Sequence, residues 1–369
     1  MRLGIFMMPV HPPHRSFTDT LSEDEEKALH ADKLGFDEMW LGEHFTATTE
    51  PIPSPLMFMA GLVPHTKNLK FGTGVICLPN HDPAIVAAEV AQFDHMSRGR
   101  FMLGIGPGGL LSDFELFDNA DRGVRARKTM EAIATMKRIW AQDPPYDFPA
   151  EFRSVQIKEA IIPSLGIGYM PKPFQKPYPP ITMSVSSRNS PTARVAGQQG
   201  WGILSGNNMP ANAVATHWVS YSKACAEAGH PASGENWRVS RNIMVAPSDS
   251  EARDRVFSEQ GSNRYFYTYM REVLSRVGIL SVMKPDPNMP DDEATVDVIT
   301  EGCALYGSPS TFLDKLVAFR DTVGPFGTLL MTGLDWSGPN GAWERDSMRL
   351  LAQDVMPKFR QHVTAQAAE

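Results

Sequence analysis

Two hydrophobic patterns alternate along the chain. Short apolar runs, typical of buried strands, are followed by longer segments in which apolar residues recur every third or fourth position, as on an amphipathic helix. The apolar runs predict eight strands: Arg2–Met7, Phe36–Leu41, Leu69–Leu78, Phe101–Ile105, Ile181–Val185, Trp201–Leu204, Trp237–Ala246 and Gly327–Met331.

Helices are predicted between these strands by capping residues and by glycine and proline at their ends. Ser22 with the acidic residues after it suggests the start of the first helix, which we expect to end at Leu34. The other predicted helices cover Pro55–Val63, Ala84–Met96, Arg122–Trp140, Pro191–Gln199, Ala211–Ala228, a segment beginning at Asp249, Ser308–Val323 and Trp343–Phe359.

Eight strand–helix alternations predict a parallel sheet in an α/β protein. Eight units in a chain of this length favour a (β/α)8 TIM barrel, and an open doubly wound sheet is the alternative. We expect residues 1–369 to form a single domain with two irregular insertions, at about 144–180 and 261–300. The first insertion is expected to contain a hairpin around Phe152–Ile162, and the tail after His362 is expected to be frayed.

Composition narrows the classes of function. The 369 residues include 35 Lys and Arg against 42 Asp and Glu, a net charge of −7, and no basic stripe, so nucleic acid is not an expected partner. Cys77, Cys225 and Cys303 lack metal-ligand spacing and fit a reducing cytoplasm, and we expect no metal site. No apolar run is long enough to span a membrane. Zinc-peptidase HExxH and serine-hydrolase GxSxG motifs are absent.

Candidate chemistry lies at the carboxyl ends of the predicted strands, which meet on one face of a barrel. Glu43 and His44 follow the second strand, and a histidine can transfer protons or stabilise an anion near neutral pH. The alternative is that His44 only caps the strand. Small residues at other strand ends would let a flat ligand approach the backbone. These strand ends include Phe6, Met8, Thr73, Gly74, Val75, Gly106 and Ser187.

Ser190 and Pro191 form a second candidate site. A serine N-cap followed by proline starts a helix whose free N–H groups, together with Arg188, could bind a phosphate. A plain capped helix with a surface arginine is the equal alternative. Residues 104–109 match GxGxxG, but Pro107 removes an N–H and no clear helix is predicted over Leu110–Phe117, so this is not a dinucleotide fingerprint.

The remaining histidines have less specific surroundings. His81 precedes a helix start and either caps it or lines the barrel mouth. His11 and His14 are expected to be solvated or bound within a loop. His95 is expected to be structural, because it lies inside a predicted helix.

Five blocks of sequence carry a resemblance to a known family: GFDEMWLGEHF (Gly35–Phe45), LKFGTGVICLPNHDP (Leu69–Pro83), QFDHMSRGRFMLGIGPG (Gln92–Gly108), the Ser186–Thr192 turn and LYGSP (Leu305–Pro309). Through these blocks the chain resembles the bacterial luciferase-like flavin-dependent monooxygenases. Within that family it is most similar to the terpenoid-oxidising group, which includes limonene and diketocamphane monooxygenases.

The resemblance implies a barrel that holds FMN, reduced by a separate flavin reductase, and that uses O2 to oxygenate a small hydrophobic substrate through a C4a-peroxyflavin. It implies a catalytic role for His44, with Glu43 orienting it. The substrate site is expected to include Phe6, Met8 and His81, and residues of the Tyr265–Thr300 segment are expected to cover an apolar substrate. Flavin-binding residues implied by the match are Thr73, Gly74, Val75, Gly106, Ser187, Arg188, Asn189, Ser190 and Thr192.

Two details follow from the same match. A non-proline cis peptide is expected at Gly74–Val75, because the matching segment lies under the flavin ring. Luciferase has a Cys-Arg pair where this chain has Gly106-Pro107, so Arg188 would have to replace the phosphate-binding arginine, and long-chain aldehyde chemistry is not expected.

Other functions stay open at this level. The same barrel serves F420-dependent oxidoreductases, although the acidic F420 tail would want more basic residues than Arg188. A non-catalytic flavin-binding barrel is the third reading. The substrate is not named by the sequence, nor is the choice between epoxidation and Baeyer–Villiger oxidation. A homodimer or homotetramer is expected from the family.

Overall fold

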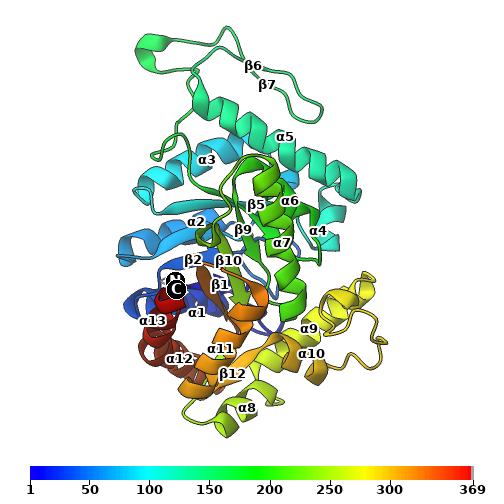
Figure 1. Ribbon diagram of the computed structural model, residues 1–369. Coiled ribbons are helices and arrows are strands. Elements are labelled where there is room, and N and C mark those ends of the chain that lie inside the picture. Colours follow the sequence, from blue (N-terminus) through cyan, green and yellow to red (C-terminus); the bar gives the residue numbers. More distant parts are fainter. Residues whose placement is uncertain (367–369) are drawn as a thin grey trace.

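Eight parallel strands close into a barrel in the computed structural model, which describes residues 1–366 (Figure 1). Each strand pairs with the next, and the last pairs with the first, through Arg2 opposite Thr328 to Met7 opposite Gly333. The predicted (β/α)8 barrel is therefore confirmed, and the open sheet is excluded. The strands are β1 (Arg2–Met7), β2 (Glu38–Leu41), β3 (Lys70–Thr73), β5 (Phe101–Gly106), β8 (Ile181–Val185), β9 (Gly202–Ser205), β10 (Trp237–Arg241) and β13 (Thr328–Gly333).

The barrel interior is organised around the buried side chain of Trp40. A Cβ at Gly72 would lie 2.5 Å from the Trp40 ring, and one at Gly104 would lie 1.7 Å from Thr73 O. Glycine at both positions therefore leaves room for the indole and for the close approach of β3 and β5. The hydroxyl of Thr73 bonds both the N–H (2.8 Å) and the carbonyl (2.7 Å) of Gly104, which fixes the two strands together.

A buried ion pair lies beside the indole inside the barrel. Glu38 is 1% exposed and accepts hydrogen bonds from Arg238 Nε at 3.0 Å, Arg238 Nη2 at 3.2 Å and Trp40 Nε1 at 2.9 Å. Arg2 Nε lies 3.1 Å from the same carboxylate. The partners lie on β1, β2 and β10, so this network links strands from both halves of the chain.

Helices surround the barrel, and most lie where the sequence predicts them. They are α1 (Phe17–Lys33), α2 (Pro55–Leu62), α3 (Pro83–Met96), α4 (Leu111–Leu116), α5 (Arg122–Ala141), α6 (Pro191–Gln199), α7 (Ala211–Glu227), α8 (Asp249–Phe257), α9 (Ser262–Arg276), α10 (Val296–Cys303), α11 (Pro309–Val323), α12 (Asn340–Leu350) and α13 (Met356–Gln366).

Three helix predictions were wrong. The first helix starts about one and a half turns before Ser22, because Ser16 caps it by accepting from Asp19 N. Residues 111–116 form the short helix α4, for which no start was predicted. The tail after His362 is helical as far as Gln366, and the rest of that prediction lies outside the described residues.

The two insertions differ from each other. The first carries a hairpin of β6 (Tyr146–Phe148) and β7 (Val155–Ile157), which projects beyond α5 (Figure 1) and begins earlier than predicted. The second was expected to be irregular but contains the helices α9 and α10. Their apolar side chains form a core of their own with α8, separate from the barrel core.

Two predicted strands are broken at the barrel rim. The third strand ends at Thr73 and resumes as β4 (Ile76–Cys77), and the seventh continues past Arg241 as β11 (Ile243–Val245), which pairs with β12 (Leu305–Gly307). The peptide between Gly74 and Val75 is cis, as the resemblance predicted. Within residues 1–366, none of the helices combines the length and apolar character needed to cross a bilayer.

Candidate active site

A cavity of about 1290 Å³, including its open mouth, lies at the carboxyl end of the barrel. Strand ends supply one wall and α9 supplies the opposite wall through Phe266, Tyr269 and Met270. Most of the lining is apolar. Its ionisable side chains include His44, Glu43 and Glu50, and uncharged polar side chains are supplied by Ser184, Ser186, Asn207 and Asn208. Among the residues predicted from the sequence, the cavity brings together Phe6, Met8, Glu43, His44, Gly74 and Val75.

His44 is held between two carboxylates. Its Nδ1 lies 3.2 Å from Asp113 Oδ2, and its Nε2 lies 3.5 Å from Glu50 Oε2. Asp113 also accepts from the backbone N–H groups of Phe45 (3.3 Å) and Thr46 (3.0 Å), so it fixes the loop that carries the histidine. Burial lowers the pKa of His44, but the charges of Glu50 and Asp113 outweigh burial and raise it.

Glu43 does not contact His44 by a hydrogen bond; its partners are elsewhere. Its Oε2 lies 2.9 Å from His81 Nε2, and its Oε1 accepts from Cys77 N at 3.1 Å. The expected role of Glu43 in orienting His44 therefore belongs to Asp113 and Glu50. His81 lines a neighbouring cavity instead of the central one, and so reaches the central cavity only through Glu43.

Thr73 and Gly106 lie directly behind the cavity wall. A Cβ on Gly106 would lie 2.8 Å from Val75 Cγ2 and 3.0 Å from Ser184 Oγ, and both Val75 and Ser184 line the cavity. Gly106 therefore sets how deeply these two side chains sit. We call Gly74, Val75 and Ser184, which line this part of the mouth, the platform of small residues; that it holds the flavin stays a prediction.

The Ser187–Thr192 turn has the predicted cap and an incompletely paired arginine. Ser190 Oγ accepts from Thr192 N at the start of α6, and Asn189 has a left-handed φ of 50°. Arg188 Nη2 donates to Asn212 Oδ1 at 2.9 Å and to Lys284 O at 3.2 Å. Its Nε is buried and has no hydrogen-bond partner among residues 1–366.

A chain of hydrogen bonds supports this turn from behind. Trp237 Nε1 donates to Ser205 Oγ at 2.8 Å, which leaves the serine hydroxyl to donate to His217 Nδ1 at 2.8 Å. His217 Nε2 then donates to Ser187 O at 3.0 Å. Burial lowers the pKa of His217 to about 4, so the histidine is neutral and its tautomer is fixed by these contacts.

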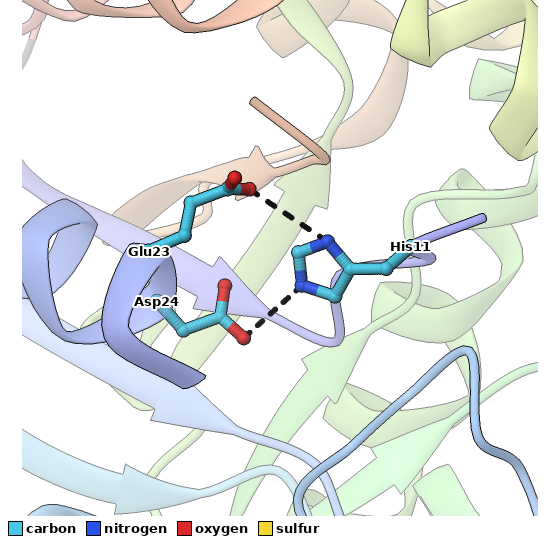
Figure 2. A group of neighbouring side chains, drawn as sticks. All are labelled: His11, Glu23 and Asp24. Atoms are coloured by element: carbon cyan, nitrogen blue, oxygen red, sulfur yellow. Dashed lines mark hydrogen bonds and ion pairs between the residues drawn. The ribbon is translucent and has the colours of Figure 1, made fainter. Parts of the chain in front are cut away.

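A second acidic cluster surrounds His11, in the loop after β1 (Figure 2). His11 points one ring nitrogen at Glu23 (3.7 Å) and the other at Asp24 (3.2 Å), within the spacing of metal ligands. No such cluster was predicted. His11, expected to be either solvated or bound within a loop, lies in the loop after β1 and is 1% exposed. Arg15 and Lys27 already pair with these carboxylates, and His11 and Arg15 also pair with Asp335. We therefore interpret the cluster as a charge network that fastens α1 to the loop after β13.

Sequence reasoning missed Glu50, which lines the cavity, and Asp113, which contacts His44; it placed residues of the Tyr265–Thr300 segment over the substrate but did not single out Tyr269. Glu50 and Asp113 lie in segments without apolar periodicity, where nothing local marks an acid as buried. Tyr269 had a usable signal, because it lies in an aromatic stretch with helical spacing (Tyr265, Phe266, Tyr269). The proline- and aspartate-rich residues that follow obscured that pattern.

Comparison with known proteins gives consistent results. The family model described as luciferase-like monooxygenase matches residues 1–324. Limonene 1,2-monooxygenase of Rhodococcus erythropolis is 31% identical, and the match covers 96% of this chain and 86% of that protein.

Solved structures extend the comparison. The oxygenating constituent of 3,6-diketocamphane monooxygenase of Pseudomonas putida, a type II Baeyer–Villiger monooxygenase solved in complex with FMN, has a TM-score of 0.87 at 27% identity. The match covers 97% of this chain and 98% of that one. An F420-dependent secondary alcohol dehydrogenase has a TM-score of 0.70 at 19% identity, covering 97% and 99%, which shows a shared fold.

Proposed function

The chain belongs to the luciferase-like monooxygenase family, and we propose that it is an FMN-dependent monooxygenase that oxygenates a small hydrophobic, terpenoid-like substrate. The observation that carries the proposal is one cavity that joins His44 to a platform of small residues and an apolar wall. FMN is the cofactor of the similar diketocamphane enzyme, and limonene is the substrate named for the relative at 31% identity.

The residues at the barrel mouth fit a flat flavin ring. Gly74, Val75 and Ser184 line the cavity on one side, and Gly206 and Gly108 line it on others, so the backbone is accessible without bulky side chains. Fitting a flat aromatic ligand requires this close approach. We expect the ring system to rest on the Gly74–Val75 platform.

The phosphate end of FMN fits the start of α6. The Ser187–Thr192 turn offers the N-terminal N–H groups of a helix, where an anion is favoured. Arg188 adds a positive charge, and its unpaired, buried Nε is a donor without an acceptor. A bound phosphate near this turn would supply that acceptor, so Ser187, Arg188, Asn189, Ser190 and Thr192 remain our candidates for phosphate contacts.

Reduced FMN, when bound, supplies the electrons for splitting O2, so that one oxygen atom enters the substrate and the other leaves as water. The chain's own contribution is to bind, orient and protect. In a protonated His44, Nδ1 is bonded to Asp113, and the Nε2–H, 3.5 Å from Glu50 Oε2, is the donor that could stabilise negative charge on an oxygen in the cavity. The apolar wall of α9 limits access of water to the same space.

Phe6, Met8 and the α9 side chains Phe266, Met270 and Val273 would contact an apolar substrate. Methionine and aromatic side chains adapt to compact hydrocarbon skeletons. The proposal also includes a flavin reductase partner, since the diketocamphane relative is described as an oxygenating constituent. A homodimeric or homotetrameric assembly and a cytoplasmic location complete it.

The deciding experiment supplies the protein with FMN, a flavin reductase, NADH and ¹⁸O2, together with limonene or a bicyclic ketone. We expect one ¹⁸O atom in the product by mass spectrometry. His44→Ala should lower product yield and raise hydrogen peroxide release, whereas His95→Ala, at an exposed helical position, should change neither. Product without ¹⁸O, or an unchanged yield in His44→Ala, would contradict the proposal.

The F420 alternative has weaker support. Its representatives among solved structures are 17–19% identical with TM-scores of 0.68–0.70, and therefore bear only on the fold. A non-catalytic flavin-binding barrel would release peroxide at a steady rate without oxygenating any substrate in the same assay.

A further inference from the structure

Glu50 is a buried carboxylate between the catalytic histidine and the covering helix. It lies in the loop after β2, is 6% exposed and lines the central cavity. Its Oε1 accepts a hydrogen bond from Tyr269, on α9, at 3.1 Å. Its Oε2 lies 3.5 Å from His44 Nε2 and has no hydrogen-bond partner among residues 1–366.

A carboxylate in so apolar a cavity needs compensation, because desolvation disfavours its charge. Burial raises the pKa of Glu50, while the positive charge of His44 and the Tyr269 hydroxyl act against that rise. Asp113 occupies the opposite nitrogen of His44. A protonated His44 therefore has a negative partner at each ring nitrogen, whereas a neutral His44 would turn an unprotonated nitrogen toward one of the two carboxylates.

We propose that Glu50 is a positioning residue that keeps a proton on His44, and that Tyr269 couples this to the placement of α9 over the cavity. The proposal rests on the proposed function, because the proton matters where oxygen chemistry takes place beside His44. Both side chains line the cavity, but His44 is the one that would donate a hydrogen bond there, and Glu50 acts through it. Among the three linked residues His44, Glu50 and Tyr269, Tyr269 is the one that the second insertion supplies.

Other charged groups face this pair from each neighbouring element. Asp113 comes from α4, Glu43 from the residues after β2, and Tyr265 from the same helix as Tyr269. His11, from the loop after β1, acts on Glu50 from a greater distance. Apart from His11, these groups are acidic or neutral, so the surroundings favour a protonated His44.

The proposal can be tested without flavin or turnover. We would label histidine with ¹³C at Cε1 and follow the His44 resonance by NMR as pH is varied, with His44→Gln to assign it. In the unmodified protein the His44 pKa should lie above that of an ordinary histidine. In Glu50→Gln the midpoint of the His44 titration should fall by about one pH unit or more, the change expected when a carboxylate at this distance is removed.

Tyr269→Phe should lower the same pKa by a smaller amount, because Glu50 loses the hydroxyl that favours its charged form. The matched controls are Glu301→Gln and Tyr306→Phe, which break another Tyr–Glu pair (2.8 Å) outside the cavity and should leave the His44 pKa unchanged. If Glu50→Gln does not fold, Tyr269→Phe alone decides the question.

An unchanged His44 pKa in folded Glu50→Gln, or in Tyr269→Phe when only that variant folds, would overturn the proposal. In the loaded enzyme, the pH at which the ratio of product to peroxide halves should move downward with the His44 pKa. The two proposals fail separately: a protein that oxygenates nothing but shows the NMR change refutes the proposed function and supports the coupling. A protein that oxygenates its substrate but shows no NMR change supports the proposed function and refutes the coupling.

Discussion

Gly106→Ala tests whether the platform of small residues sets the fit of the flavin. The added Cβ would lie 2.8 Å from Val75 Cγ2 and 3.0 Å from Ser184 Oγ, whereas carbon atoms in contact prefer about 3.5–4.0 Å. The contact between the added Cβ and Val75 must therefore lengthen by about 0.7–1.2 Å, which displaces Val75. Overpacking of this kind costs about 1–3 kcal/mol of folding free energy.

The expected change in thermal stability follows from chain length. At about 2.1 cal/mol/K per residue, the 369 residues give an unfolding entropy of about 0.8 kcal/mol/K, so Tm should fall by about 1–4 °C. A Val75 displaced into the platform should also weaken FMN binding about tenfold, which corresponds to about 1.4 kcal/mol. Flavin fluorescence titration and calorimetry measure the two effects.

Gly61→Ala is the matched control, because nothing lies within 4 Å of a Cβ at this position in α2. It should raise stability by up to about 1 kcal/mol, the usual gain from replacing glycine in a helix, and leave FMN binding unchanged. If Gly106→Ala binds FMN as tightly as the unmodified protein and melts at the same temperature, the platform argument is wrong.

Two further predictions concern buried carboxylates, Glu38 and Asp335, that do not line the central cavity. Glu38→Gln should destabilise the barrel by about 3–5 kcal/mol in urea unfolding, because it leaves buried Arg238 unpaired. Asp297→Asn, at an exposed pair with Arg264, should cost at most about 1 kcal/mol, and equal losses would contradict the argument. Burial opposes ionisation of Asp335, but hydrogen bonds from His11, Ser337 and Arg15 hold its pKa below the usual range. Its stabilisation should be complete above about pH 4 and be lost as pH falls through the folded-state pKa. The stability difference from Asp335→Asn should therefore shrink on acidification, and a constant difference would refute this.

The sequence predicts the barrel well because the relevant signals are local. Alternating apolar runs and amphipathic segments recur along the whole chain, and each barrel strand pairs with the barrel strand that comes next in the sequence. The first helix shows the limit of such reasoning. Ser16 and Ser22 each have an acidic residue three positions later (Asp19 and Glu25), and both look like a helix start. Packing decides for Ser16, because Asp24 is then buried against His11.

The second insertion illustrates a different limit. Its helices pack on each other, on α8 and on segments at the barrel rim, apart from the barrel core, so no strand–helix alternation predicts them. Their role is visible only in three dimensions, where Tyr269 and Phe266 face the strand ends across the cavity. The substrate-facing wall is therefore the part of the site that sequence pattern describes least.

His44 shows why adjacency in sequence misled the assignment of its partner. Successive residues in extended backbone point in opposite directions, and Glu43 accordingly turns to His81 and the Cys77 N–H while His44 faces the cavity. The acids that pair with His44 come from the loop after β2 and from α4, which is 69 residues away at Asp113. Two histidine–carboxylate pairs therefore lie back to back at the mouth. The protonation of His44 depends on segments that only barrel closure brings together.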